Sequence, residues 1–145
     1  MSTRRKIMML ITVIAFVVLI PITSHSKELG EFCWDVRDTD NIGNPDNLLR
    51  LQVTQHGNNY SFHGTYNYYN GMKLKFEDTP VFGSGYVSSI IIKTDLKGFG
   101  YMVLNVADLN GYGCSYNSTY SGIEDCISNK MIGVDYDITK VTCPR

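Results

Sequence analysis

The sequence has little of what catalysis usually requires. It contains three histidines, and only His56 and His63 lie beyond residue 26. There is no GxSxG or HExxH motif, and no glycine-rich loop ends in a phosphate-binding lysine. The carboxylate pairs at 77–78 and 124–125 are adjacent in sequence, so on strands their side chains would point to opposite faces and suit solvent better than acid–base work. We therefore predict that the chain is not an enzyme and needs no cofactor.

Long apolar runs are also scarce, and the main one lies at the start of the chain. Residues 7–20 are almost wholly apolar, follow Arg4-Arg5-Lys6, and precede a short polar stretch with Ser24 and Ser26. This pattern is typical of a signal peptide that is cleaved before Lys27. The rival interpretation is an uncleaved anchor, but a spanning helix needs about 20 apolar residues. We predict a signal peptide at 1–26, one domain at 27–145, and a secreted or periplasmic protein without stable membrane insertion after leader removal.

Neither sign of charge dominates the sequence. The predicted leader holds three of the 13 basic residues and none of the 14 acidic residues, which leaves the mature chain with a net charge of −4. A mildly acidic surface without clusters of basic residues does not favour binding to nucleic acid or to an anionic membrane. We therefore predict no nucleic-acid partner.

Close cysteine pairs of the CxxC kind are missing. The four cysteines all lie in the predicted mature chain, and the nearest two are twelve residues apart, at Cys114 and Cys126. Zinc sites usually use closer pairs, whereas an even number of cysteines in a small exported domain indicates disulfides. Two disulfides are therefore expected, with three possible pairings.

Alternation of apolar and polar residues dominates the rest of the chain. It is clearest in residues 48–69, where two alternating runs flank the turn sequence His56-Gly57-Asn58-Asn59. This pattern predicts a β-hairpin, because side chains on a strand point to opposite faces in turn and Gly and Asn tolerate tight turns. We expect Leu49, Leu51 and Val53 to be buried, and the residues between them to be largely exposed: Arg50, Gln52 and Thr54.

Other alternating runs predict further strands and a closed fold. We expect strands at residues 27–36, 72–77, 81–96, 101–109, 112–120 and 131–141, a break at Pro80, and one short helix within 121–130 that begins with a capping box formed by Ser121 and Glu124. Short connections predict an all-β fold: a small up-and-down antiparallel meander of seven or eight strands that closes into a barrel. A Cys33–Cys143 disulfide would then join the first strand to the last, and a Cys114–Cys126 disulfide would clamp the late loop.

The loop at 37–47 is rich in oxygen donors and invites comparison with a calcium site. Asp38 and Asp40 have the spacing of the first two EF-hand ligands, but Ile42 occupies the third position and Leu49 the place of the bidentate glutamate. Aspartate, asparagine and glycine are also what an ordinary surface turn uses. We predict no metal site.

Aromatic residues are the unusual feature of the composition. The chain has ten tyrosines, and Tyr60, Phe62, Tyr66 and Tyr68 fall on one face of the second strand of the hairpin. These rings could fill a small barrel, line an amphipathic cavity in which their hydroxyls find partners, or form an outer patch that binds protein or sugar. Because they share a face, we expect the four to play one role together. Trp34 is the only tryptophan and has two interpretations, a core residue or a ligand-stacking residue.

The chain resembles the lipocalin and avidin group of small secreted barrels. The resemblance lies in the exported leader, the first strand with Gly30-Glu31-Phe32-Cys33-Trp34, the tyrosine-rich meander and the late cysteine pair. The lipocalin Gly-x-Trp signature differs here, since Trp34 follows Gly30 by four residues. The resemblance implies a ligand-binding barrel fold and assigns no binding residues.

Two functions from different classes fit these observations. The first is a barrel that binds a small amphipathic or apolar ligand inside, lined by Trp34, Phe62, Tyr66, Tyr68, Leu104 and Val106. The second is a disulfide-stabilised protein-interaction module, such as an inhibitor of a secreted hydrolase, that uses loops 37–47 and 97–100. The first needs an open cavity of at least about 300 Å³, whereas the second needs a filled core and a projecting loop.

Overall fold

The computed structural model describes residues 25–38, 47–70, 73–116, 121–128 and 135–145, with the backbone alone at 38, 68–70 and 73–77. Most of the predicted signal peptide (1–24) and of the oxygen-rich loop (39–46) lie outside the described residues. Within the described part of the chain, no helix is both long and apolar enough to cross a membrane.

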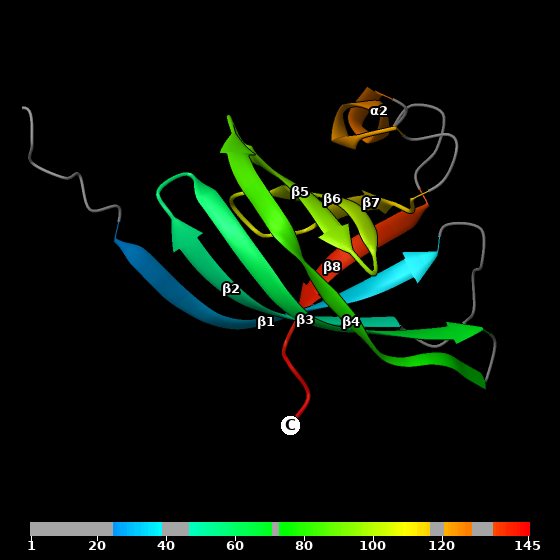
Figure 1. Cartoon of the computed structure of the whole chain (residues 1–145). Helices are drawn as coiled ribbons and strands as arrows, with labels where there is room; N and C mark the ends of the chain where they lie inside the picture. Colours follow the sequence, from blue (N-terminus) through cyan, green and yellow to red (C-terminus); the bar gives the residue numbers. More distant parts are fainter. Residues whose placement is uncertain (1–24, 39–46, 71–72, 117–120, 129–134) are drawn as a thin grey trace, which may run out of the picture.

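The described residues form one closed antiparallel barrel (Figure 1). Its strands follow one another in chain order: β1 (Ser26–Asp38), β2 (Asn47–His56), β3 (Asn59–Asn70), β4 (Lys73–Ser88), β5 (Ile91–Lys97), β6 (Gly100–Asn105), β7 (Gly111–Cys114) and β8 (Tyr136–Val141). One short helix, α2 (Ile123–Ser128), lies between β7 and β8. The prediction of an up-and-down barrel of seven or eight strands with at most one short helix is confirmed for the described residues, which form eight strands and one short helix.

The β2–β3 hairpin forms as predicted and supplies much of the core. Leu49, Leu51 and Val53 are buried, and the turn lies at Gly57, whose φ of 63° suits glycine. The expectation of largely exposed neighbours is wrong, since all three intervening side chains of β2 are half-buried. At Arg50 the cause is visible: its guanidinium donates a hydrogen bond to the Pro144 carbonyl at 2.5 Å, so the end of the chain lies across this outer face.

The barrel closes where β1 pairs with β8. The paired residues run from Cys33 opposite Val141 to Asp38 opposite Tyr136. The Cys33–Cys143 disulfide joins the same two segments, with a Cα–Cα distance of 5.1 Å. The predicted connection between the first and last strands is therefore confirmed.

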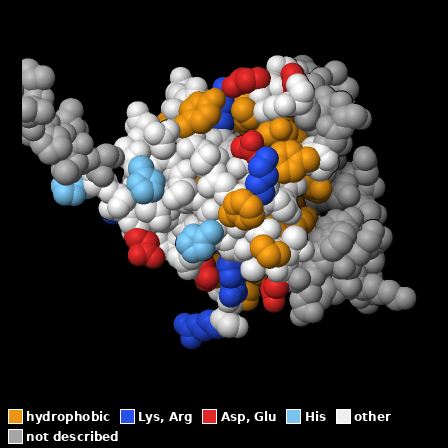
Figure 2. All heavy atoms as spheres, viewed as in Figure 1, with side chains coloured by type: hydrophobic (Ala, Val, Ile, Leu, Met, Phe, Trp, Pro, Cys, Tyr) orange, Lys and Arg blue, Asp and Glu red, His pale blue; other side chains and the backbone are white. Residues whose placement is uncertain are grey.

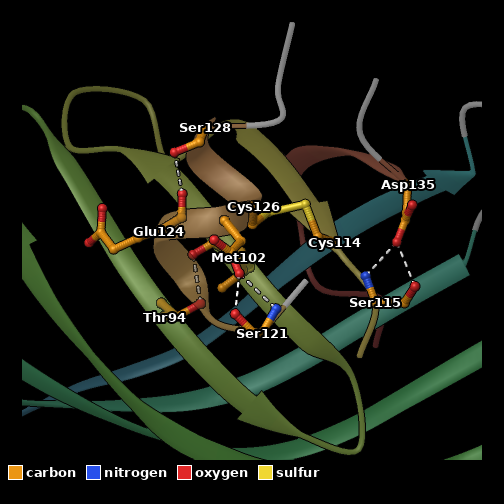
Figure 3. Close-up of a disulfide and its surroundings, with 10 residues drawn as sticks. Thr94, Met102, Cys114, Ser115, Ser121, Glu124, Cys126, Ser128 and Asp135 are labelled. Carbon is orange, nitrogen blue, oxygen red and sulfur yellow. Dashed lines mark hydrogen bonds between the residues drawn. A yellow bond between two sulfur atoms is a disulfide. The ribbon is translucent and has the colours of Figure 1, made fainter. Parts of the chain in front are cut away.

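Helix α2 is held against the outside of the barrel by the second disulfide (Figure 3). Cys114 and Cys126 are bonded as predicted, and both are fully buried beside the buried ring of Tyr101 of β6. The expected capping box does not form, because the backbone N–H of Ser121 donates to the Asp125 carboxylate (2.9 Å) rather than to Glu124. Glu124 instead pairs with Lys93 of β5, which ties the helix to a second strand.

Two expectations about the region of strand β4 are wrong. The strand continues through Pro80, which pairs opposite Thr65 of β3 and lies beyond the last β4–β5 pair, Phe82 with Lys97. Proline is tolerated there because no strand on that side needs its N–H. The strand predicted at 81–96 is in fact the end of β4 and all of β5, joined by a tight turn at residues 89–90.

The later strands are shorter than predicted. Strand β6 ends at Asn105 and is followed by a loop that contains Leu109, and β7 ends at Cys114. Residues 117–120 and 131–134, which were expected to be strand, lie outside the described residues. Helix α2 falls within the segment that was expected to be helical.

Candidate functional site

An apolar pocket opens at one end of the barrel. We call it the open-end pocket; it has a volume of about 120 Å³. Five strands and a loop contribute to its wall: Leu29, Phe32, Trp34, Val53, Tyr60, Phe62, Ile92, Leu104, Val106 and Leu109. The only polar side-chain atoms in this set are the Tyr60 hydroxyl and the Trp34 indole nitrogen, and the indole N–H is bonded to the Leu109 carbonyl, so the wall suits a hydrocarbon group.

The rim of the open-end pocket is fixed by hydrogen bonds between connections. The Val87 N–H donates to the Asn58 carbonyl at 2.9 Å and joins β4 to the β2–β3 turn. The Val106 N–H donates to the Ile90 carbonyl, also at 2.9 Å, and joins the β6–β7 loop to the β4–β5 turn. Because backbone groups make both bonds, the rim does not depend on flexible side chains.

Trp34 forms the floor of the pocket. It is 1% exposed, and its indole N–H donates to the Leu109 carbonyl at 2.9 Å. Phe32 stacks beside it, with ring centroids 6.0 Å apart. The bond from β1 to the β6–β7 loop crosses the barrel interior, so Trp34 is both a core residue and part of the pocket wall.

Glycine on β4 makes room for the aromatic wall. Gly85 lies opposite Tyr60, and a Cβ atom added there would lie 3.2 Å from the Phe62 ring and 2.8 Å from Cγ2 of Thr94. A larger residue would have to displace its neighbours. The missing side chain therefore allows Phe62 to lie close to β4.

The structure brings four of the six predicted ligand-lining residues together. Trp34, Phe62, Leu104 and Val106 all line the open-end pocket. Tyr66 does not, and the side chain of Tyr68 lies outside the described residues. Whether any of them contacts a ligand remains a prediction.

Tyr66 belongs to an aromatic plug at the opposite end of the barrel. Its ring meets the Phe99 ring edge-on at a centroid distance of 5.1 Å, and Phe99 in turn lies 5.5 Å from the Tyr136 ring. Tyr66 and Phe99 are both buried. The expectation of one shared role is therefore wrong: four residues along a strand span about 13 Å, so Phe62 and Tyr66 reach different ends of the interior.

The pocket is smaller than the ligand-binding hypothesis required. Its volume of about 120 Å³ lies well below the expected minimum. An engineered apolar cavity of about 150 Å³ in another protein binds benzene, so a space of this order takes one ring or a short alkyl segment. A larger ligand must therefore extend out of the mouth.

Several pocket residues were not identified from the sequence. Leu29 and Phe32 both line the pocket although they are three residues apart, because the β1–β2 register shifts between Glu28 and Gly30. Gly30 has a φ of 99°, and a glycine within an alternating strand was the available signal for this bulge. Ile92 was missed because the β4–β5 turn was not predicted, and Leu109 was missed because it lies in a loop that was predicted to be strand.

A second cavity lies outside the barrel beside the β1–β8 seam. We call it the seam groove; it has a volume of about 490 Å³ and is lined by Glu31, Phe32, Cys33, Lys140, Val141, Thr142 and Cys143. The Glu31 carboxylate and the two sulfur atoms lie within 4.8 Å of one another. Both sulfurs are bonded to each other, so neither is a thiolate that could bind a metal.

Aromatic and charged side chains form an outer patch on the sheet. The patch consists of Phe82, Tyr86, Lys93, Asp95, Lys97 and Tyr116, of which Phe82 is 59% exposed. Figure 2 shows hydrophobic side chains and charged groups gathered over this part of the barrel. The patch is distinct from the open-end pocket, since none of its residues lines that pocket.

The charges of the outer patch are paired with groups around them. The Tyr116 hydroxyl donates to Asp95. Burial is the larger cause, and this hydrogen bond the smaller one, of the raised pKa of Tyr116. The hydrogen bond to Glu124 at 2.6 Å raises the pKa of Lys93. Lys97 lies 3.8 Å from Asp95 and 4.8 Å from the centroid of the Tyr116 ring. The net charge of the patch is therefore low.

His56 and His63, the histidines beyond the predicted leader, lie away from the open-end pocket. Both are exposed, and the Nε2 atom of His56 is 3.3 Å from the Ser61 hydroxyl oxygen. Neither histidine lines either cavity. That the chain is not an enzyme remains a prediction.

The projecting loop of the interaction hypothesis is described only in part. The turn between β5 and β6 exposes Lys97 and Gly98 but buries Phe99 in the aromatic plug. This turn is therefore anchored in the core.

Comparisons with family models, with curated proteins and with solved structures find no match to this chain.

Proposed function

We propose that this chain is an exported, non-catalytic barrel that binds the apolar end of a small amphipathic molecule. The observation that carries the proposal is the open-end pocket, which opens to solvent between connections fixed by backbone hydrogen bonds. Its wall is apolar apart from the Tyr60 hydroxyl and the Trp34 indole N–H, which is already bonded to the Leu109 carbonyl. An apolar ligand larger than one ring or a short alkyl segment cannot be enclosed in this pocket. A molecule with one ring or a short alkyl end can bury that end and leave its polar part outside.

Export is supported by the disulfides and by the sequence at the start of the chain. Two disulfides and no free cysteine among the described residues suit an oxidising compartment. The basic and apolar leader pattern points to the same route.

Trp34 offers a direct assay for binding. It is the only tryptophan of the chain and lines the pocket, so a ligand in the pocket changes the surroundings of its indole ring. We expect octyl glucoside, titrated below its micelle concentration, to change the Trp34 emission saturably. An absence of saturable binding by octyl, phenyl and benzyl glucosides would contradict the proposal.

A matched pair of variants locates the site. Val106 is 45% exposed and lines the pocket, whereas Ile90 is 71% exposed on the neighbouring turn and does not. Val106→Phe should fill the mouth and weaken octyl glucoside binding about tenfold, the value expected when about two methylenes are kept in water. Ile90→Phe should leave the affinity within about twofold. Equal losses in both variants would place the bound probe elsewhere.

The second candidate function is a protein-interaction module, such as an inhibitor of a secreted hydrolase. The outer patch favours it, because exposed rings of Phe82, Tyr86 and Tyr116 on one sheet face are typical of protein contacts. The test is inhibition of a panel of secreted proteases and glycosidases by the wild type and by Phe82→Ser. Inhibition that is lost in Phe82→Ser and kept in Val106→Phe would favour this function over the first.

A further inference from the structure

The open-end pocket and the seam groove meet at one residue. Phe32 lines both cavities, and no other residue in the described part of the chain does. The apolar interior and the more polar groove outside therefore adjoin across a single aromatic ring. A molecule that has its apolar end in the pocket can pass Phe32 and place its other end in the groove.

The pairing of the strands explains why the groove lies at this point. Strand β1 extends from Ser26, but its pairing with β8 begins only at Cys33. Phe32 is thus the first residue past the end of the β1–β8 ladder, and within the described ranges no strand continues β8 alongside it. On its β8 side, this part of β1 therefore borders the seam groove and not a paired strand.

Two exposed groups of opposite charge lie in the seam groove. The Lys140 ammonium is 5.2 Å from the centroid of the Phe32 ring. The carboxylate of Glu31, the residue that precedes Phe32, lies beside the disulfide. The Thr142 hydroxyl adds a group that both donates and accepts hydrogen bonds.

We propose that the seam groove binds the polar head of the ligand and that this head is zwitterionic. This inference rests on the proposed function, since it concerns the other end of the same molecule. A head with one negative charge is attracted by Lys140 but repelled by Glu31, and a head with one positive charge has the reverse problem. A head that carries both charges can place each one beside its opposite.

Three probes with the same octyl chain test the head group. They are octanoate, octyltrimethylammonium and an octyl betaine, titrated at low ionic strength so that surface charges are not screened. The wild type should bind the betaine most tightly. Glu31→Gln should strengthen octanoate binding, and Lys140→Gln should strengthen binding of the ammonium probe, each about two- to fivefold, the range of an exposed charge pair.

Matched controls for both groove variants are available on β1. Lys27 and Glu28 are exposed residues of β1 that line neither cavity. Lys27→Gln and Glu28→Gln make the same chemical changes and should leave the order of the three probes as in the wild type. All four substitutions are at exposed positions, so the barrel should stay folded in each variant.

The possible results separate the two proposals. If no probe binds saturably, the proposed function fails and this inference fails with it. If all three probes bind with the same affinity to the wild type, and neither Glu31→Gln nor Lys140→Gln makes their affinities differ, the proposed binding in the pocket is kept and the proposal of a zwitterionic head is refuted. If the control variants shift the order as much as the groove variants do, only the net charge matters and the groove assignment is refuted.

Discussion

Removing the seam disulfide should destabilise the barrel more than removing the disulfide of α2. The Cys33–Cys143 bond closes a sequence separation of 110 residues, and the Cys114–Cys126 bond closes one of 12. In the chain-entropy model a disulfide stabilises by restricting the unfolded chain, and the effect grows with the logarithm of loop length. The model gives about 4.8 kcal/mol for the seam and about 2.8 kcal/mol for the α2 bond at 25 °C.

Packing acts in the opposite direction, which makes the comparison informative. Cys114 and Cys126 are both fully buried against Tyr101, whereas Cys143 is only half-buried near the end of the chain. A change from cysteine to alanine therefore removes more buried contact at α2 than at the seam. A larger loss of stability at the seam cannot come from packing and must come from loop closure.

The assay is urea unfolding of two double variants at 25 °C. One carries Cys33→Ala and Cys143→Ala, the other Cys114→Ala and Cys126→Ala, and Trp34 fluorescence reports the loss of the buried core. Extrapolation to water gives each free energy of unfolding. Loop closure alone favours the seam by about 2 kcal/mol, and the greater packing loss at α2 reduces this difference, so we expect the seam variant to lose up to about 2 kcal/mol more than the α2 variant. A larger loss in the α2 variant would show that packing and not loop closure sets the order, and would refute the prediction.

Three further predictions concern the core, the alkaline limit and the pocket. Leu51→Ala should lower the free energy of unfolding by about 2–5 kcal/mol in urea titrations, because Leu51 is fully buried. The melting temperature should fall as pH rises above about 10, because burial raises the pKa values of Tyr101 and Tyr112 and the Glu124 hydrogen bond raises that of Lys93. The unfolded chain then releases these protons at lower pH than the folded chain does, which favours unfolding. Tyr101→Phe should make the fall in melting temperature shallower, and an unchanged profile would contradict the prediction. In a series of alkyl glucosides, affinity measured by Trp34 emission should rise about fourfold per methylene and then level off when the pocket is full; affinity that does not depend on chain length would contradict an apolar site.

The fold could be predicted because several local patterns agree. Leu49, Leu51 and Val53 alternate up to a Gly-Asn turn, and this combination fixes both the hairpin and the face that is buried. Once the strands are ordered as a meander, Cys33 falls on the first strand and Cys143 two residues beyond the end of the last strand, so both lie at the seam that closes the barrel. The pairing of the disulfides then follows from the topology.

The β4–β5 turn could not be predicted from turn residues. Ser89 has a φ of 57°, a conformation for which glycine is the usual residue, and Ile90 is an exposed apolar residue. The turn also changes which residues face inward. Val87 pairs directly with Ile92, so both lie on the inner face, whereas uninterrupted alternation from Phe82 would have placed Ile92 outside.

The pocket could be predicted only in part, since it depends on interruptions of the period of two. Trp34, Phe62 and Leu104 lie on regular strand positions and were identified. Leu29 enters the pocket through the bulge before Gly30, and Leu109 enters from a loop. A two-residue period carries no information about such positions.

The difference between the two ends of the barrel follows from what the connections place inside it. At one end, Phe99 enters from the β5–β6 turn and meets Tyr66, which fills the space between the strands. At the other end, the β2–β3 turn consists of Gly57 and Asn58, and the Ile90 side chain in the β4–β5 turn is exposed to solvent. No aromatic residue from these two turns enters the interior, so the space above Trp34 remains open although the core beneath it is fully buried. The pocket is thus a consequence of turn composition and not of a weakly packed core, and substitutions at its exposed mouth, such as those at Val106, should change binding more than they change stability.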